Sequence, residues 1–460
     1  MMRKIQALNL RERYSVVLFA LFVVAVFFRD VSGLPVPSVF LTALAFLLFF
    51  ANDFKYIGAF LAFVLPSSAG IPNLAIFSLV MIFGVLKISK SIRVNTWVLV
   101  CVILIAMREL FAAFNPAFAF QQRIFVNFFV LFFLIYLFIP SCYKKLDFSL
   151  MLKAYLWGVL FMAANIFFQF VAVYGLREFL DLGVRIGNTQ THFDFGGTGH
   201  RVSNDQNLLG VFCSTALYVF LIMNHKKLLP WYYALLLPPI IGFGLLTQSR
   251  GFLFSVATIF AYYILAVILE QRRSAVKSSS AIIIPIVTAI LCFVAFFHFL
   301  PQYGDNLIER LERDDVTGGR ADIMASFNRF LLGNPLYLFR GAGGIQGYRT
   351  LAGVTYSVHN GFQEILLTWG FLGFVIVAVL MYNLYRIAKS GRKLDFLGFL
   401  PLIMYFFDLV TAQWFSSTGM LFLNLIWFST TKMLTTLPQE MLTQQPLVSE
   451  ELQKVKKSYA

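Results

Sequence analysis

The chain has 460 residues, of which 59% are hydrophobic and only 13% are charged. No single soluble core of this size needs so many long apolar runs, so the composition excludes a soluble globular protein and predicts a polytopic helical membrane protein. The strict apolar and polar alternation of an outer-membrane barrel is missing from the sequence. The net charge of +15 does not indicate nucleic-acid binding, because its lysines follow the predicted topology and face an anionic inner leaflet.

Hydropathy predicts fourteen apolar spans in two sets. The first set lies near 14–28, 38–51, 56–66, 74–86, 96–112, 124–139 and 150–174. The second lies near 207–223, 230–246, 251–269, 281–300, 361–383, 396–411 and 418–434. Two of these, 56–66 and 74–86, are short for a hydrocarbon layer of about 30 Å, and the segment between them is compatible with a re-entrant turn. The prediction is therefore an all-α bundle of 12–14 transmembrane helices.

Lysine and arginine divide between the two predicted sides of the membrane. Basic residues from Arg3 to Arg13 precede the first span and place the N terminus in the cytoplasm, and every later lysine also falls inside. The predicted outer side carries arginine alone, at Arg29, Arg108, Arg123, Arg177, Arg185, Arg201, Arg250, Arg310, Arg313, Arg320, Arg329, Arg340 and Arg349. A guanidinium can grip a phosphate through two N–H groups, whereas a lysine is a point charge. The pattern predicts an anion-binding outer face.

A large extracytoplasmic loop is predicted at residues 301–360, the longest polar interruption in the chain. Apolar residues recur at helical spacing after Arg320, which indicates an amphipathic helix from about Arg320 to Leu332 that lies on the membrane. The glycines between Gly341 and Gly347 are interpreted as a flexible turn. Local acids offer a simpler role for Arg310 and Arg313 than phosphate binding, because six carboxylates share the loop with the arginines.

Three short motifs on the predicted outer side could carry chemistry. Arg201 precedes Ser203 and Gln206, whose spacing is that of a capping box, so a helix with its positive end at the membrane surface is expected there. Arg250 lies in a turn with no room for a loop between two spans, where an unpaired charge is costly. His359 stands at the start of a span with Glu364 about one turn on, and imidazole is a common general base near neutral pH.

Five short motifs follow one another in a fixed order along the chain. They are Arg201 with the asparagine that follows it, Thr247 to Gly251, the Gly-Gly-Arg of 318–320, the glycines of 341–347, and His359-Asn360 with Glu364. In order and spacing this set resembles the O-antigen ligase and O-antigen polymerase superfamily of bacterial membrane glycosyltransferases, over roughly residues 200–375. The sequence departs from the family pattern at two places: Asn204 to Asn207 stand after Arg201 where a turn with glycine or proline is common, and no tryptophan follows Arg320 within two helical turns.

The resemblance implies a metal-independent glycosyltransferase without a cofactor, in the bacterial inner membrane. Its donor is expected to be a glycan on undecaprenyl diphosphate, and its acceptor a hydroxyl of another glycan or of the lipid A core. His359 is expected to deprotonate that hydroxyl, while Arg250 and Arg320 hold the diphosphate. Substrate contacts are expected at Arg201, Asn207, Asn360 and Glu364.

Further implied partners are a chain-length regulator and a flippase of the same pathway. Residues 1–437 are expected to form one membrane domain, with the motifs at about 200–375, and residues 438–460 a polar tail with both chain ends in the cytoplasm. A polymerase that joins repeat units is favoured over a ligase. A transporter or flippase is the alternative from another class. Such proteins place ionisable groups near the middle of the bilayer, where this chain offers mainly the polar pair Asn165 and Gln169.

Overall fold

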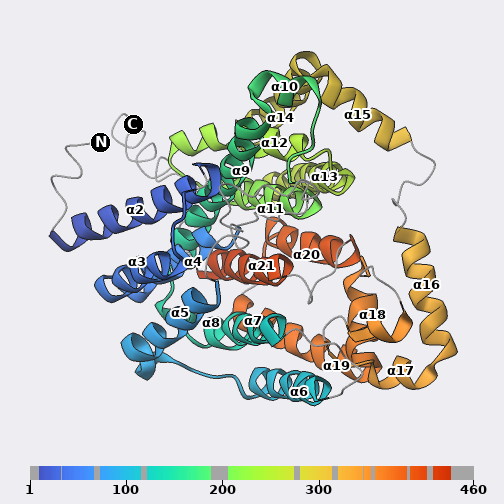
Figure 1. Ribbon diagram of the computed structural model, residues 1–460. Coiled ribbons are helices and arrows are strands. Elements are labelled where there is room, and N and C mark those ends of the chain that lie inside the picture. Colours follow the sequence, from blue (N-terminus) through green and yellow to red (C-terminus); the bar gives the residue numbers. More distant parts are fainter. Residues whose placement is uncertain are drawn as a thin grey trace, which may run out of the picture.

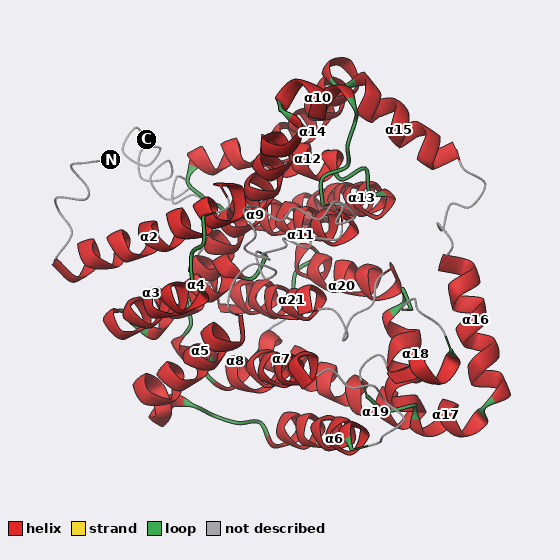
Figure 2. Cartoon of the chain, viewed as in Figure 1, coloured by secondary structure: helices red, strands yellow, loops and turns green. Residues whose placement is uncertain are grey.

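The computed structural model describes residues 10–32, 34–66, 73–114, 122–187, 206–273, 280–312, 320–344, 347–353, 358–390, 394–411 and 418–436. Within these residues all regular structure is helical and no strand occurs (Figure 2). The predicted all-α, polytopic helical class is confirmed. Arg201 and the tail at 438–460 lie outside the described residues.

Each apolar segment predicted from hydropathy forms a helix (Figure 1). The first half contains α2 (Leu10–Ser32), α3 (Ser38–Ala51), α4 (Phe54–Val64), α5 (Asn73–Ile88), α6 (Thr96–Ala113), α7 (Gln122–Phe133), α8 (Ile139–Ser141), α9 (Phe148–Tyr174) and α10 (Leu176–Asp181). A π-helical turn, Leu134–Phe138, joins α7 to α8. Asn95 and Asp147 cap α6 and α9 by accepting N–H groups three residues on.

The second half contains α11 (Gln206–His225), α12 (Leu237–Leu246), α13 (Arg250–Arg273), α14 (Ser280–Phe299), α15 (Pro301–Glu312), α16 (Arg320–Gly333), α17 (Pro335–Arg340), α18 (Gly347–Ala352), α19 (Gly361–Lys389), α20 (Leu400–Thr411) and α21 (Thr418–Thr436). A 3₁₀ segment, Trp231–Leu236, leads into α12, and another, Leu397–Phe399, into α20. The predicted loop is thus itself largely helical, because α15 to α18 fill it.

Helix length separates the predicted spans into two groups. In the described residues six helices are long and apolar enough to cross a membrane, or seven if the bent pair α14 and α15 counts as one span. Five further apolar helices have only 10–17 residues. The expected twelve to fourteen spans are therefore present as helices, but only about half of them reach the length that a full crossing needs.

The short helix α4 is largely enclosed by the bundle. Nine of its eleven residues are buried, with Lys55 and Tyr56 exposed near its start, and its most extensive packing is against α9. Gly158 of α9 permits this approach, since a Cβ there would lie 2.2 Å from the carbonyl oxygen of Phe63. A small residue at a close crossing is typical of packed membrane helices. An enclosed eleven-residue helix, about 16 Å long, fits a re-entrant element better than a separate span.

Helix α19 is interrupted at Gly370, which has φ 69° and ψ −170°. The interruption frees the carbonyls of Leu367 and Thr368, and these accept the backbone N–H groups of Ala342 and Gly343, each at 2.8 Å. The glycine turn expected to be flexible is instead docked on the broken helix. A backbone group freed inside a membrane protein needs such a partner, so the turn completes the hydrogen bonding of the helix.

Two carboxylates lie buried inside helices that the sequence predicted as spans. Glu109 of α6 and Asp408 of α20 are both buried, as are Asn165 and Gln169 of α9. Glu109 accepts a hydrogen bond from Trp369 Nε1 at 2.6 Å, which ties α6 to the interrupted part of α19. The polar groups buried in these helices therefore go beyond the pair Asn165 and Gln169 that the sequence indicated.

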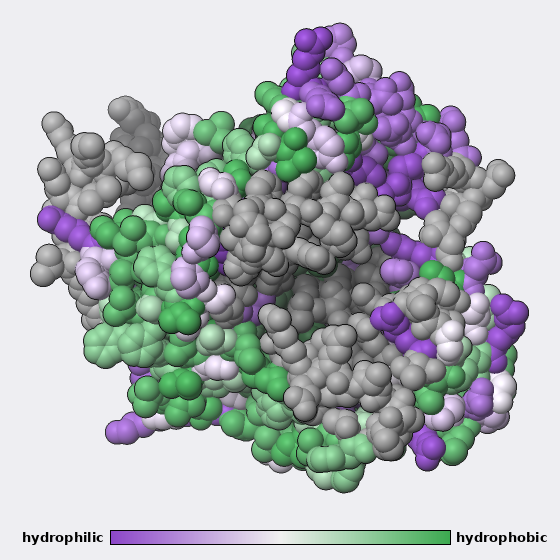
Figure 3. All heavy atoms as spheres, viewed as in Figure 1, coloured by the Kyte–Doolittle hydropathy of each residue, from purple (hydrophilic) through white to green (hydrophobic). Residues whose placement is uncertain are grey.

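The surface differs between the two sides of the molecule. Figure 3 shows hydrophobic side chains over the side that carries α2 to α6, and hydrophilic side chains gathered over α10 and α15. Large exposed apolar residues on α3, α5 and α6 accord with contact with lipid. Helices α16, α17 and α18 form one edge of the molecule, beside the start of α19 (Figure 1).

Candidate active site

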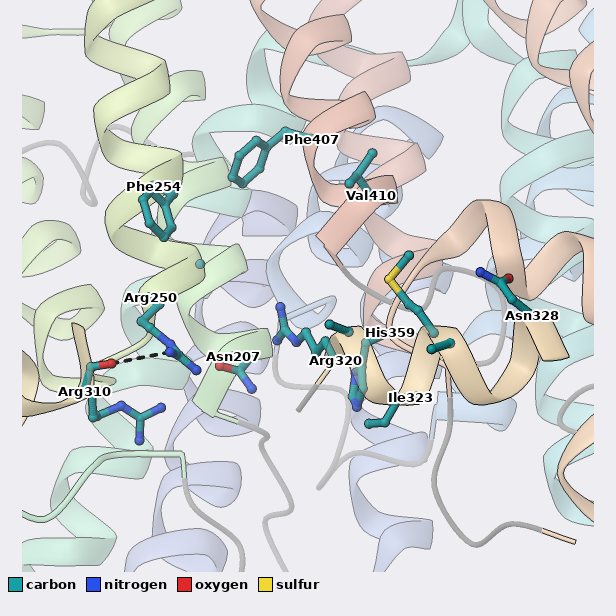
Figure 4. A pocket seen from close by; sticks show the side chains of 14 residues that line it. Asn207, Arg250, Phe254, Arg310, Arg320, Ile323, Asn328, His359, Phe407 and Val410 are labelled. Carbon is teal, nitrogen blue, oxygen red and sulfur yellow. Dashed lines mark hydrogen bonds between the residues drawn. The ribbon is translucent and has the colours of Figure 1, made fainter. Parts of the chain in front are cut away.

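A cavity of about 670 Å³ lies where α11, α13, α15, α16, α19 and α20 meet. Asn207, Arg250, Arg320 and His359 all line it, so the structure brings together four residues predicted as site residues from separate motifs (Figure 4). Arg310 lines it too. None of the described lining residues is an aspartate or a glutamate, and the cavity wall is therefore cationic.

Four helices begin at this cavity. Asn207 is in the first turn of α11, Arg250 and Arg320 are the first residues of α13 and α16, and His359 lies two residues before α19. The N-terminal end of a helix carries a partial positive charge and backbone N–H groups without helical partners. A cation at such a position is unfavourable by itself, so two arginines there indicate a site built for an anion.

The turn that carries Arg250 is held by side chains on both sides. Arg185 donates to the carbonyls of Thr247 and Gln248 at 2.9 and 3.5 Å, and the Gln248 amide donates to the Gly183 carbonyl at 2.9 Å. Gln248 has φ 47°, in the left-handed region that residues other than glycine seldom adopt. Arg185 therefore serves the turn and not the cavity, in contrast to the phosphate-binding setting expected for the arginines of this face.

Arg250 is oriented by a neighbouring helix. Its Nη1 donates to the backbone carbonyl of Arg310 at 3.3 Å, as the dashed line in Figure 4 shows. In the same turn Ser249 donates to Asn207 Oδ1 at 3.2 Å, which links the start of α11 to the start of α13. Arg250 and Asn207 thus occupy fixed positions on one side of the cavity.

Helix α16 forms the opposite wall. The amphipathic helix predicted from Arg320 to Leu332 is present as Arg320–Gly333. Phe327 and Leu331 are buried in a small satellite core, whereas Ile323 and Met324 line the cavity. The apolar spacing correctly predicted the helix, but part of the face expected to lie on the membrane lines the candidate site.

His359 is held between two anchored residues. The Val358 N–H donates to the Tyr348 hydroxyl at 3.3 Å, and Tyr348 packs edge-on against Phe327 of α16. On the other side, Asn360 caps α19 by accepting the Gln363 N–H at 3.0 Å and donates to the Val410 carbonyl at 3.1 Å. The imidazole itself is half-buried on the cavity wall.

Two of the predicted substrate contacts lie next to the cavity but are not among its lining residues. Asn360 is buried and engaged with α19 and α20, and Glu364 is 1% exposed. From these positions Asn360 and Glu364 can stabilise the segment that carries His359. Arg201 lies outside the described residues, so the structure leaves its position open.

Arg108 and the glycine turn lie apart from the cavity. Arg108 Nη2 donates to the carbonyls of Arg340 and Gly341 at 3.3 and 3.2 Å, at the end of α17. Its guanidinium also occupies the space that a side chain at Gly343 would fill. This arginine fastens α6 to the turn, whereas Arg250, Arg310 and Arg320 line the cavity.

Several cavity residues were not predicted. Arg310 was expected to pair with nearby acids, yet it lines the cavity beside Arg250. Asn328 lies two helical turns after Arg320, so the helical period of α16 could have indicated it. Phe407 and Val410 come from α20, far along the chain, and no local signal in the sequence connects them with His359.

Comparison with known proteins gives a family match over part of the chain. No curated protein matches the chain. Residues 233–378 match the family model described as O-antigen ligase, and this stretch contains Arg250, Arg310, Arg320 and His359. This match, which covers residues 233–378 and not the whole chain, supports membership of the O-antigen ligase and polymerase superfamily.

Proposed function

We propose that the chain transfers a glycan from undecaprenyl diphosphate to a sugar hydroxyl at the periplasmic face of the bacterial inner membrane. The observation that carries the proposal is the convergence of four helix N termini with three guanidinium groups and one imidazole in a single cavity. Helix termini and arginines together suit a diphosphate, because both supply N–H donors and positive potential. Both chain ends are proposed to be cytoplasmic.

In the proposed reaction His359 takes the proton of the acceptor hydroxyl as the oxygen attacks the anomeric carbon of the donor sugar. The bond between that carbon and the diphosphate oxygen breaks, and its electron pair leaves with undecaprenyl diphosphate. Arg250 and Arg320 offset the charge that develops on the leaving oxygen, a role in which one donor contributes about 10²–10³ in rate. The proposed reaction requires no metal or cofactor.

A polymerase acting on lipid-linked repeat units is the first form of the proposal, and a ligase acting on the lipid A core is the second. Deletion of the gene separates them. Lipopolysaccharide with a single repeat unit is the outcome for a polymerase. Bare core together with accumulated lipid-linked polymer is the outcome for a ligase.

The proposal is tested by replacing His359 with alanine. Loss of a general base lowers a rate by about 10²–10⁴, so extension or transfer of the glycan in cells should fall to background while the protein still inserts and accumulates. The matched control is His298→Ala, at the end of α14 and away from the cavity lining. Normal polysaccharide from the His359 variant would refute the mechanism.

A further inference from the structure

The cavity has two chemically different ends (Figure 4). Arg250 and Arg310 lie at one end, and Asn328 of α16 lies at the other, with His359 between them. The first end offers charge to a diphosphate. The second offers a neutral amide, which can hydrogen-bond a hydroxyl but brings no charge to a phosphate.

A buried glutamine fixes the Asn328 side chain. Gln363 Nε2 donates to Asn328 Oδ1 and to the Met324 carbonyl, both at 2.8 Å. Gln363 is 5% exposed, and its own N–H is bonded to Asn360, so it is a rigid support. These bonds also fasten the wall helix α16 to the first turn of α19.

The bond from Gln363 decides which end of the Asn328 amide faces the cavity. An asparagine amide has one oxygen acceptor and one nitrogen with two N–H donors. Because Oδ1 accepts from Gln363, the nitrogen is directed the other way, and Figure 4 shows it on the side toward His359. Asn328 is otherwise exposed, so its orientation does not follow from packing in the core.

We propose that Asn328 binds the acceptor sugar, with Nδ2 donating to a hydroxyl oxygen next to the hydroxyl that His359 deprotonates. This inference rests on the proposed function and names the acceptor end of the same site. Gln363 is the positioning residue, since it acts on the acceptor only through Asn328. A single neutral hydrogen bond of about 0.5–1.5 kcal/mol corresponds to a change of roughly 2- to 13-fold in acceptor affinity.

The test uses the full-length protein in lipid nanodiscs with a purified undecaprenyl-diphosphate-linked glycan as donor. Initial rates are measured against acceptor concentration at saturating donor, and against donor concentration at saturating acceptor. Asn328→Ala should raise the acceptor KM roughly 2- to 13-fold and leave the donor KM unchanged. Asn328→Asp, which keeps an oxygen but loses the N–H donors, should show the same split.

Two further variants separate binding from folding. Gln363→Ala should raise the acceptor KM, and adding it to Asn328→Ala should have no further effect, because the two residues act as one unit. Arg329→Ala changes the next residue of α16, which is exposed and does not line the cavity, and it should behave as wild type.

Acceptors that each lack one hydroxyl identify the group that is bound. The wild type should lose affinity for one of them, and Asn328→Ala should no longer distinguish that acceptor from the parent glycan. If Asn328→Ala raises the donor KM and the acceptor KM equally, or leaves the acceptor KM unchanged, the assignment of Asn328 is overturned and the proposed function still stands. Absence of transfer by the wild-type protein, or full activity of His359→Ala, overturns the proposed function and this inference with it.

Discussion

Replacing Arg250 with lysine keeps the charge and removes the fork, so it tests how the site grips an anion. Arg250 Nη1 is engaged by the Arg310 carbonyl at 3.3 Å, and the rest of the guanidinium lines the cavity. A lysine ammonium has no second nitrogen, so it cannot hold the carbonyl and a phosphate in the same planar geometry. The cation remains at the start of α13 in both proteins.

The expected loss follows from the role of one preorganised donor. Removing such a donor costs about 2.7–4 kcal/mol of transition-state stabilisation, or roughly 10²–10³ in rate. Because lysine retains the charge, we expect Arg250→Lys near the lower limit, about 10²-fold slower than wild type, and Arg250→Ala near the upper limit. The lost bond to the Arg310 carbonyl costs stability by only about 1–3 kcal/mol, so the protein should still accumulate.

The assay is transfer of a lipid-linked glycan by purified protein, with membrane accumulation measured in parallel. Arg177→Lys is the matched control, since the Arg177 side chain is 96% exposed and pairs only at the surface, with its Nε 3.6 Å from Asp181 Oδ2. Such an exposed pair contributes little, and transfer should remain normal. Wild-type rates from Arg250→Lys would refute the bidentate grip and reduce Arg250 to a membrane anchor.

Two predictions concern the junction between α6, the glycine turn and α19. Gly341→Ala should lower the melting temperature and the amount of inserted protein, because Gly341 has φ 71° and a Cβ would lie 2.4 Å from the Thr368 carbonyl oxygen. Gly333→Ala is the control, since a Cβ at Gly333 would meet nothing within 4 Å. Equal melting curves for the two variants would contradict the docked turn. Glu109→Ala should destabilise the protein by about 1–3 kcal/mol by stranding the Trp369 N–H, whereas Glu109→Gln should be milder. Thermal unfolding in detergent measures the stability of the Gly341 and Glu109 variants. An equal loss of stability in Glu109→Ala and Glu109→Gln would exclude the hydrogen bond to Trp369 as the cause.

Much of the helical framework could be predicted from the sequence, because helix formation in a membrane depends on local properties. Each apolar segment found by hydropathy is a helix, and the spacing after Arg320 correctly placed α16. Hydropathy could not show that α4 is enclosed by other helices, since a buried apolar helix and a lipid-facing one have the same composition. It also could not reveal Glu109 as the partner of Trp369, 260 residues away.

The candidate site shows the same division. His359, Arg250 and Arg320 could be selected from the sequence because their chemistry and their places at the starts of helices are local features. Only the tertiary structure put them in one cavity, turned Arg310 toward it and assigned Arg108 to the glycine turn. The physical reason is that the sequence determines which groups a segment can offer, whereas the packing of distant helices decides which of those groups meet. The sequence alone cannot distinguish an arginine that binds backbone carbonyls from one that lines the cavity, because the difference lies in the neighbours that packing provides.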